Sequence, residues 1–136
     1  MQARVSIYSR ADLESLSQEG IPGDTAVICF YDINKGLMDL PRHIDSYQIA
    51  MDGPAFNEMD VLAHFIFYAK ATRLKIICVC ETGLSESAGC AAAIRQFYNG
   101  DGIEVFANYH YFPDKQIYQD VFNALIEESS KLGEFE

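Results

Sequence analysis

Basic residues are scarce in this sequence. Its 136 residues include 10 Lys and Arg against 20 Asp and Glu, which gives a formal net charge of −10 at pH 7. A surface with this excess of negative charge repels nucleic-acid phosphates and anionic lipid headgroups at long range. We therefore expect neither nucleic acid nor a membrane surface among the partners of the protein.

Long apolar runs are also missing. No stretch approaches the roughly 18 consecutive apolar residues of a membrane-spanning helix, and residues 1–10 lack the apolar core of a signal peptide. Cysteine is limited to Cys29, Cys78, Cys80 and Cys90, and a chain of this length and apolar content does not need disulfides. These absences predict a cytoplasmic protein whose cysteines are free thiols.

Internal repeats and low-complexity linkers are absent as well, which indicates one domain rather than several. Hydrophobic residues make up 49% of the chain, enough to bury a sizeable core. We assign residues 1–132 to this domain and expect residues 133–136 to form a frayed tail.

Short apolar stretches alternate with segments of helical periodicity, a pattern typical of α/β proteins. The expected strands are residues 5–8, 26–31, 47–51 and 75–80. Two of them, 26–31 and 75–80, are continuous apolar runs, as expected of central strands buried on both faces. The predicted fold is a single α/β domain with a central, mainly parallel sheet and helices on both faces.

Capping and turn residues predict where the helices begin. The expected starts are at Ser9, Asn57, Ser87 and, for the last helix, Pro113. The helix from Asn57 ends near Thr72 and carries an apolar face of Val61, Leu62, Phe65, Ile66 and Ala69. Residues 32–45 contain polar and turn-forming types and are expected to form a long loop.

The segment from Cys80 to Ser87 combines features that favour anion binding and thiol chemistry. Cys80 ends a strand predicted to be central, Gly83 lies in the short loop that follows, and a helix begins at Ser87. This order directs backbone N–H groups and the positive end of the helix dipole at whatever lies over Cys80. The same groups favour a thiolate, the nucleophilic form of cysteine. We predict that the N–H groups of residues 82–87 converge near the Cys80 sulfur.

The sequence Cys80-Glu-Thr-Gly-Leu-Ser-Glu-Ser87 resembles the active-site loop of the cysteine-dependent protein phosphatases, whose pattern is Cys, five residues, Arg, then Ser or Thr. It is most similar to the small bacterial branch of the tyrosine and dual-specificity phosphatases, where the loop typically reads Cys-Glu-Ala-Gly-Ile-Ser-Arg-Ser. Weaker similarity covers most of the chain, through the strand before Asp52 and Phe112-Pro113. The resemblance implies phosphate-ester chemistry at a loop between a strand and a helix, and we expect neither a cofactor nor a metal ion.

In that family a Cys thiolate attacks phosphorus, a Ser or Thr hydroxyl stabilises the leaving thiolate, and an Asp from a neighbouring loop protonates the leaving group. The resemblance therefore implies that Cys80 is the nucleophile, Ser87 the hydroxyl and Asp52 the acid. The rest of the loop would bind the anion through residues Glu81, Thr82, Gly83, Leu84, Ser85 and Glu86.

One position departs from the family pattern, because Glu86 occupies the place of the arginine that grips the phosphoryl oxygens. An acceptor-only anion there replaces a planar cation with five N–H donors, so an attraction becomes a repulsion. Each loss of about 1.4 kcal/mol lowers the rate tenfold. Glu86 and Glu81 also oppose ionisation of Cys80, so we expect a nearly ordinary thiol and very low or absent phosphatase activity.

Few other cations could replace the missing arginine. Arg95 lies about 12 Å further along the helix, and Arg73 and Lys75 lie at the wrong end of their strand. The loop of residues 32–45 leaves the carboxyl edge of the sheet, where open α/β sheets bind ligands. Its candidate cations are Lys35, Arg42 and His43.

Each candidate residue also has a structural interpretation. Cys80 fits a small buried apolar residue, Glu86 a favourable anion in the first turn of a helix, and Asp52 a turn former. Cys90 is expected to pack in the core, although it could approach Cys80 and form a disulfide under oxidation. Cys78 and Cys80 lack the second ligand pair of a metal site.

Three functions follow from these alternatives. The first is a pseudophosphatase or weak phosphatase that binds a phosphate-like anion or a phosphorylated substrate. The second is an active cysteine enzyme, either a phosphatase with a cation from another loop or a catalyst of sulfur transfer or oxyanion reduction. The third is an interaction module, for which the net charge favours basic protein partners. The match of Cys80, Gly83 and Ser87 to the family pattern favours the first.

Overall fold

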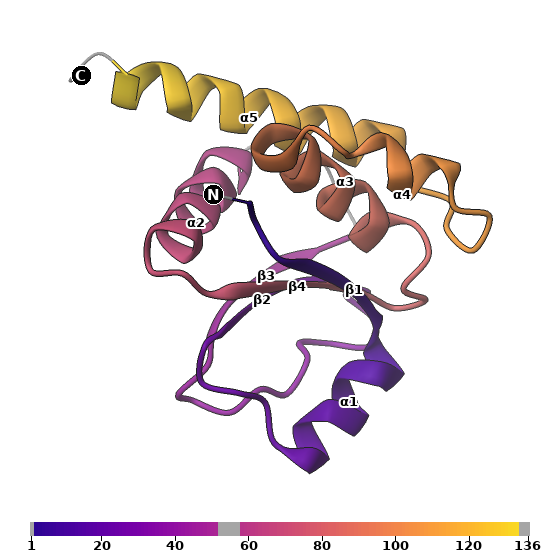
Figure 1. The fold of residues 1–136 in the computed structure, drawn as a ribbon. Coiled ribbons are helices and arrows are strands. Elements are labelled where there is room, and N and C mark those ends of the chain that lie inside the picture. Colours follow the sequence, from indigo (N-terminus) through magenta and orange to yellow (C-terminus); the bar gives the residue numbers. More distant parts are fainter. Residues whose placement is uncertain (1, 52–57, 134–136) are drawn as a thin grey trace.

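The computed structural model describes residues 2–51 and 58–133, in which strands and helices alternate (Figure 1). Along the chain they are β1 (Val5–Ser9), α1 (Arg10–Glu19), β2 (Thr25–Tyr31), β3 (Asp45–Ala50), α2 (Met59–Ala71), β4 (Lys75–Cys80), α3 (Glu86–Asn99), α4 (Ile103–Ala107) and α5 (Lys115–Gly133). The predicted α/β class is confirmed.

The strands form one parallel sheet in the order β1-β4-β2-β3. The two apolar runs become the inner strands β4 and β2, whose residues are buried throughout except at Lys75 and Tyr31. Because the strands are parallel, their carboxyl ends meet at one edge of the sheet. At that edge Cys80 lies between Ser9 of β1 and Phe30 of β2. The prediction of a mainly parallel sheet with central strands 26–31 and 75–80 is confirmed.

Helices cover both faces of the sheet, as predicted (Figure 1). α2 and α3 pack over one face, with α4 beside α3 and α5 lying across α2 and α3, whereas α1 and the segment between β2 and β3 cover the other. The larger core lies under α2, α3 and α5 and includes Ile28, Ile94 and Leu125. A smaller core under α1 includes Leu13 and Val79. With both faces covered, the loops at the carboxyl edge are the part of the sheet open to a ligand.

The start of α1 forms the predicted capping box. Ser9 Oγ accepts a hydrogen bond from the Asp12 N–H at 3.0 Å, and the Asp12 carboxylate accepts one from the Ser9 N–H at 3.4 Å. Two donors that an isolated helix would leave free are thereby satisfied. The first turn of α1 is therefore fixed next to the end of β1, at the carboxyl edge.

Two predicted details need correction, and one short helix was not predicted. Val61 is 51% exposed rather than buried, because it lies about 100° around α2 from Leu62, which faces the core. The helix α4 was not expected, because its five residues span little more than one turn and are too few to show a helical pattern of apolar residues. The last helix begins at Lys115, where the Asp114 carboxylate accepts from the Ile117 N–H at 3.0 Å, and Pro113 precedes it.

The ends of two predicted segments coincide with the limits of the described residues. Asn57, the expected start of the second helix, lies outside them, and the described helix begins at Met59. α5 includes Gly133, the first residue of the predicted tail, and residues 134–136 lie outside the described residues. In residues 2–51 and 58–133, no helix is both long and apolar enough to cross a membrane.

Candidate active site

The loop of residues 81–85 connects β4 to α3 at the carboxyl edge. Gly83 makes its turn with a φ of +72°, in the left-handed region that favours glycine. A β-carbon at this position would lie 2.7 Å from the backbone nitrogen of Ser9. Glycine is therefore required twice, by the turn and by the close approach of the loop to the end of β1.

Backbone hydrogen bonds hold the loop from its other side. The Phe112 N–H donates to the Leu84 carbonyl at 2.8 Å, and the Asp114 N–H donates to the Ser85 carbonyl at 3.1 Å. Within the loop, Thr82 Oγ1 accepts from the Leu84 N–H at 3.2 Å. The segment before α5 thus fixes the conformation of the loop.

Cys80 lies beneath this loop and is 1% exposed. Its Sγ accepts a hydrogen bond from the Gly83 N–H at 3.2 Å. Ser87 Oγ lies 3.0 Å from the same sulfur, and Thr82 Oγ1 lies 3.9 Å from it. The N–H groups of Ser85 and Ser87 also act on the thiol. Of the N–H groups predicted to converge on the sulfur, that of Gly83 donates to it directly, and those of Ser85 and Ser87 lower the pKa of the thiol.

The pKa of Cys80 lies below the ordinary value of a thiol. Burial is the largest single influence and raises the pKa, but hydrogen bonds from the Ser87 side chain and from the N–H groups of Ser87 and Ser85 outweigh it. The negative charge of Glu86 raises the pKa, as predicted. The Ser87 hydroxyl, which the family pattern assigns to a later step of the chemistry, is the largest of the influences that lower the pKa.

The Glu81 carboxylate is paired with cations, although the sequence predicts that its charge opposes ionisation of Cys80. Its Oε2 accepts from Arg10 Nη1 at 3.0 Å and from the Asp32 N–H at 3.0 Å. Lys35 Nζ lies 3.8 Å from Oε1 of the same carboxylate. Two cations therefore compensate the charge of Glu81.

Sequence reasoning overlooked Arg10 as a residue of this site. The sequence shows only that Arg10 directly follows a strand; its place beside Glu81 depends on the register of β1 with β4, in which Ser9 pairs with Cys80. Besides Glu81, its guanidinium donates to the carbonyls of Gly36 and Leu37 at 3.1 and 3.0 Å. Arg10 thereby joins the loop after β4 to the segment after β2.

A cavity of about 280 Å³ opens at the same edge, lined by Phe30, Asp32, Met51, Glu81 and Glu86. Phe30 pairs with Cys80 in the sheet, which places the cavity beside the cysteine. Three of the five lining side chains are carboxylates. In the part of the chain that the structure describes, no cation lies within ion-pair distance of Glu86. The cavity wall therefore carries negative charge that repels an anion.

The other cations suggested by the sequence lie elsewhere. Arg95 binds the carboxylates of Asp101 and Glu104 at 2.9 and 2.6 Å, at the far end of α3. Arg42 and His43 are exposed and come just before Asp45, where β3 begins at the edge of the sheet opposite Cys80. None of these replaces an arginine beside Cys80.

The remaining cysteines belong to the core. Cys29, Cys78 and Cys90 are free and fully buried, so the expected core packing of Cys90 is confirmed. Hydrogen bonding with Cys90, followed by burial, raises the pKa of Cys78, and burial raises the pKa of Cys29 to about 12. Among the described residues, no three His, Cys, Asp or Glu side chains gather closely enough to hold a metal ion. The predicted acid Asp52 lies outside the described residues.

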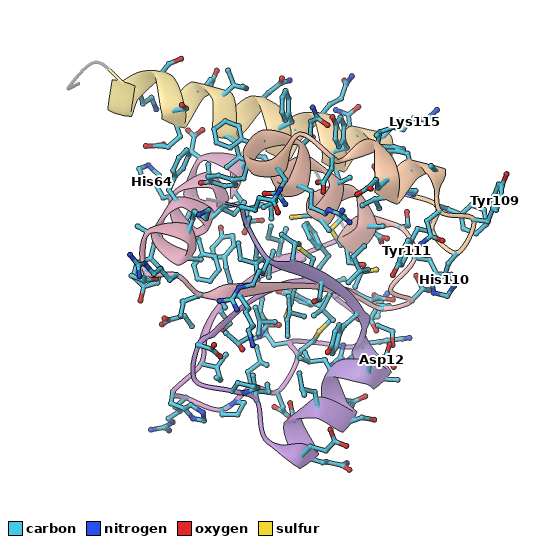
Figure 2. All side chains as sticks on the ribbon, viewed as in Figure 1. Asp12, His64, Tyr109, His110, Tyr111 and Lys115 are labelled. Carbon is cyan, nitrogen blue, oxygen red and sulfur yellow. The ribbon has the colours of Figure 1, made fainter. Side chains whose placement is uncertain are left out.

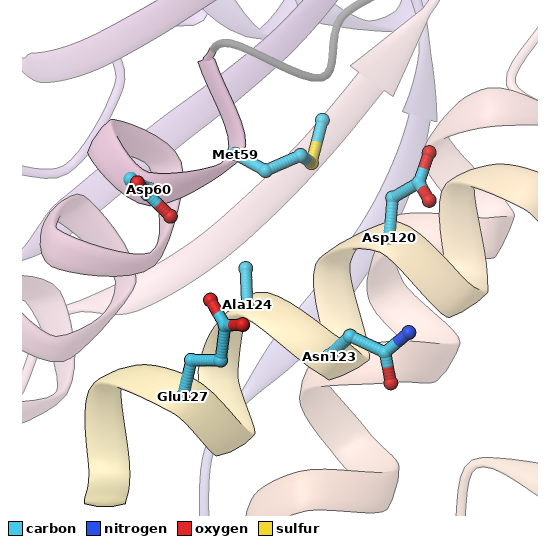
Figure 3. A pocket seen from close by; sticks show the side chains of 6 residues that line it. All are labelled: Met59, Asp60, Asp120, Asn123, Ala124 and Glu127. Carbon is cyan, nitrogen blue, oxygen red and sulfur yellow. The ribbon is translucent and has the colours of Figure 1, made fainter. Parts of the chain in front are cut away.

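A second cavity of about 280 Å³ lies between α2 and α5 (Figure 3). Its lining residues are Met59, Asp60, Asp120, Asn123, Ala124 and Glu127. On the same pair of helices, His64 Nε2 lies 3.1 Å from Glu128 Oε2, and Figure 2 shows His64 at the outer side of α2. No residue of the Cys80 loop lines this cavity.

Together the fold and this loop define the class: the chain has the fold of the protein tyrosine and dual-specificity phosphatases. It is similar to the solved structure of DUSP15, with 18% identity, a TM-score of 0.65, and coverage of 94% of this chain and 86% of that one. PTPMT1 in complex with PI(5)P has 15% identity and a TM-score of 0.61, with coverage of 95% of this chain and 94% of that one. The human tyrosine phosphatase-like serine/threonine/tyrosine-interacting protein has 17% identity and a TM-score of 0.55, with coverage of 91% of this chain and 86% of that one. No protein-family model matches the chain, and no curated protein matches its sequence.

Proposed function

We propose that the protein is a pseudophosphatase or weak phosphatase, which binds a phosphate-bearing group over Cys80 and hydrolyses it very slowly or not at all. One observation carries the proposal. Glu86, the first residue of α3, lines the cavity beside Cys80. In the family that the loop resembles, this position belongs to the arginine that grips the phosphoryl oxygens.

The proposed anion site is the backbone of residues 81–86. The Gly83 N–H already donates to the Cys80 sulfur, and α3 begins directly after the loop. N–H groups at a helix start favour an anion. PTPMT1 was solved in complex with PI(5)P, which supports a phosphate-bearing ligand or a phosphorylated substrate as the class of partner.

The proposed roles of the side chains follow the family pattern. The Cys80 thiolate attacks phosphorus, and the bond from phosphorus to the leaving oxygen breaks while Asp52 gives that oxygen a proton. Water then releases phosphate, and the Ser87 hydroxyl stabilises the returning thiolate. The lowered pKa of Cys80 and the 3.0 Å distance from its Sγ to Ser87 Oγ support the roles of these two residues.

The charges around the cavity support weak activity. At about 4 Å and an effective dielectric constant of about 20, each pair of unit charges interacts by roughly 4 kcal/mol. Exchanging an attraction for a repulsion at Glu86 therefore slows the reaction by several powers of ten. Arg10 does not compensate, because its donors are directed to Glu81 and to two backbone carbonyls.

We also propose that the protein works in a reducing compartment such as the cytoplasm of a bacterium. The four free cysteines support this compartment, since no disulfide holds the described fold. The bacterial origin rests on the loop sequence alone.

The proposal is tested by hydrolysis of an aryl phosphate by the unmodified protein and by Glu86→Arg. We expect the unmodified protein to remain near background and Glu86→Arg to gain about 10- to 100-fold. The substitution restores the attraction to the phosphoryl group and removes a charge that raises the pKa of Cys80. We expect only part of the phosphatase activity to return, because the effects of catalytic residues that act together are not additive.

Two control variants complete this test. Glu86→Arg combined with Cys80→Ser loses the gained activity if the thiolate carries the reaction. Glu14→Arg makes the same change of charge on an exposed position of α1 and gains nothing. Strong turnover by the unmodified protein that depends on Cys80 would show that another cation reaches the cavity, and the pseudophosphatase proposal would be abandoned.

The lowered pKa of Cys80 favours one second candidate, sulfur transfer. In that reaction the thiolate attacks the outer sulfur of thiosulfate, sulfite leaves, and cyanide then removes the sulfur as thiocyanate. No arginine clamp is strictly needed for this chemistry. Thiocyanate formation that disappears in Cys80→Ser, without any aryl phosphate hydrolysis, would favour sulfur transfer over the first proposal.

A further inference from the structure

Arg10 lies at the candidate site but has no role in the proposed phosphatase chemistry. Its Nη1 lies 3.0 Å from Glu81 Oε2 and 3.1 Å from the Gly36 carbonyl, and its Nη2 lies 3.0 Å from the Leu37 carbonyl. The same Glu81 oxygen accepts the Asp32 N–H at 3.0 Å. Arg10 therefore makes a planar set of contacts that fixes the Glu81 carboxylate in one orientation.

This ion pair is only slightly open to solvent. The side chains of Arg10 and Glu81 are 20% and 21% exposed, so water and salt screen their charges less than at an open surface. Lys35 also approaches Glu81, but at 3.8 Å and with 62% of its side chain exposed. Arg10 is thus the principal partner of Glu81.

Glu81 follows Cys80 directly in the sequence, so an unpaired Glu81 would place a negative charge beside the thiolate. The other charged groups at this edge are Asp32 and Glu86, both anionic. Cys29 and Cys78 of the inner strands are buried in the two cores, and the pKa of each thiol is raised, that of Cys29 by burial and that of Cys78 by a hydrogen bond and burial. Arg10 and Lys35 are accordingly the described cations that oppose this negative charge.

We propose that Arg10 is a positioning residue of the site, which binds the Glu81 carboxylate and so keeps its charge from acting on the Cys80 thiolate. The inference rests on the proposed function in one respect, because it takes the thiolate as the reactive group. Arg10 acts through Glu81 and does not touch the sulfur. Among the cysteines its charge acts on Cys29, whose pKa it lowers against the larger effect of burial.

The experiment follows the ionisation of Cys80 by NMR of protein labelled with ¹³C-cysteine. The Cys80 signal is assigned by its loss in Cys80→Ser, and its chemical shift is recorded against pH. The variants are Arg10→Gln, Glu81→Gln, the double variant and Arg10→Lys. Arg95→Gln is the matched control, because Arg95 also binds two carboxylates but lies at the far end of α3.

We expect Arg10→Gln to raise the pKa of Cys80 by about 0.5 to 1 pH unit, which lowers the thiolate fraction about three- to tenfold. Glu81→Gln lowers the pKa slightly, because it removes the part of the Glu81 charge that Arg10 and Lys35 do not compensate. In the Glu81→Gln background, Arg10→Gln shifts the pKa by less than half as much. In Arg10→Lys the pKa of Cys80 lies between its values in the unmodified protein and in Arg10→Gln. Arg95→Gln leaves the pKa of Cys80 unchanged.

An equal effect of Arg10→Gln in both backgrounds would show that Arg10 acts by its own charge alone, and the inference would fail. Absence of any shift in Arg10→Gln and Glu81→Gln would overturn it as well. Should Arg10→Gln fail to fold, Glu81→Gln and Arg10→Lys still decide the matter. Aryl phosphatase activity gained by Glu86→Arg tests the proposed function separately, so either proposal can fail while the other stands.

Discussion

The candidate site has two parts that lie within a few residues of each other and differ in construction. The floor comprises the Cys80 sulfur, the N–H groups of residues 83, 85 and 87, and the Ser87 hydroxyl. The rim comprises the carboxylates of Asp32, Glu81 and Glu86. Hydrogen bonds in the floor lower the pKa of Cys80, while the Glu86 charge in the rim raises it. The comparison teaches that packing can preserve a cradle for an anion while charged side chains above it oppose the anion.

The strongest way to break the floor is Gly83→Ala. The new β-carbon would lie 2.7 Å from the Ser9 backbone nitrogen, and the alanine would also have to adopt the φ of +72° that Gly83 has. We expect a loss of about 2 to 4 kcal/mol in the free energy of unfolding, measured by urea denaturation. Gly100→Ala is the matched control, since its φ is +74° with no atom within 4 Å of a β-carbon, and it costs about 1 kcal/mol. Equal losses in both variants would contradict the role of close packing.

A milder change in the floor is Ser87→Ala, which removes the hydroxyl 3.0 Å from the sulfur. Because that hydrogen bond lowers the pKa of Cys80, its loss raises the pKa by about one pH unit. Any reaction of the thiolate then needs a higher pH, and its pH–rate profile moves to the alkaline side. Thr82→Val removes a hydroxyl at 3.9 Å and causes a smaller shift. A larger shift in Thr82→Val than in Ser87→Ala would show that the Thr82 hydroxyl, rather than that of Ser87, is the main side chain lowering the pKa of Cys80.

The smallest expected effect comes from the rim. Glu86→Gln removes the charge that raises the pKa of Cys80, so the pKa falls by about half a pH unit. The free energy of unfolding decreases by only about 0.5 kcal/mol, because a favourable anion is lost from the start of α3. The shift is opposite in sign to that of Ser87→Ala, and both are read from the same titration of the Cys80 signal. A rise of the pKa in Glu86→Gln would contradict the division into floor and rim.

Most of the floor could be predicted because its information is local in the sequence. The continuous apolar run ending at Cys80 gives β4 with the bounds that the structure shows. The glycine three residues later and the helix start beside Ser87 then determine where the loop turns. Neighbouring residues along the chain therefore predict the position of the loop, whereas its contacts with Ser9, Phe112 and Asp114 come from distant segments.

The rim could not be predicted in the same way, because its contacts join segments far apart in the sequence. Arg10 reaches Glu81 across the ends of β1 and β4, and Lys35 approaches it from the segment after β2. The strand order places these residues together, and a periodic pattern does not specify which side chain binds which. The role of Asp52 stays a prediction, since it lies outside the described residues.

The contacts of the loop also have a consequence for synthesis on the ribosome. Gly83 packs against Ser9, while Leu84 and Ser85 bind the N–H groups of Phe112 and Asp114. A nascent chain that has emerged only as far as α3 therefore possesses the cysteine but not the contacts that shape its surroundings. The cradle is completed late, after the segment before α5 has left the exit tunnel. Until then the loop lacks the two backbone hydrogen bonds from Phe112 and Asp114 that fix its conformation.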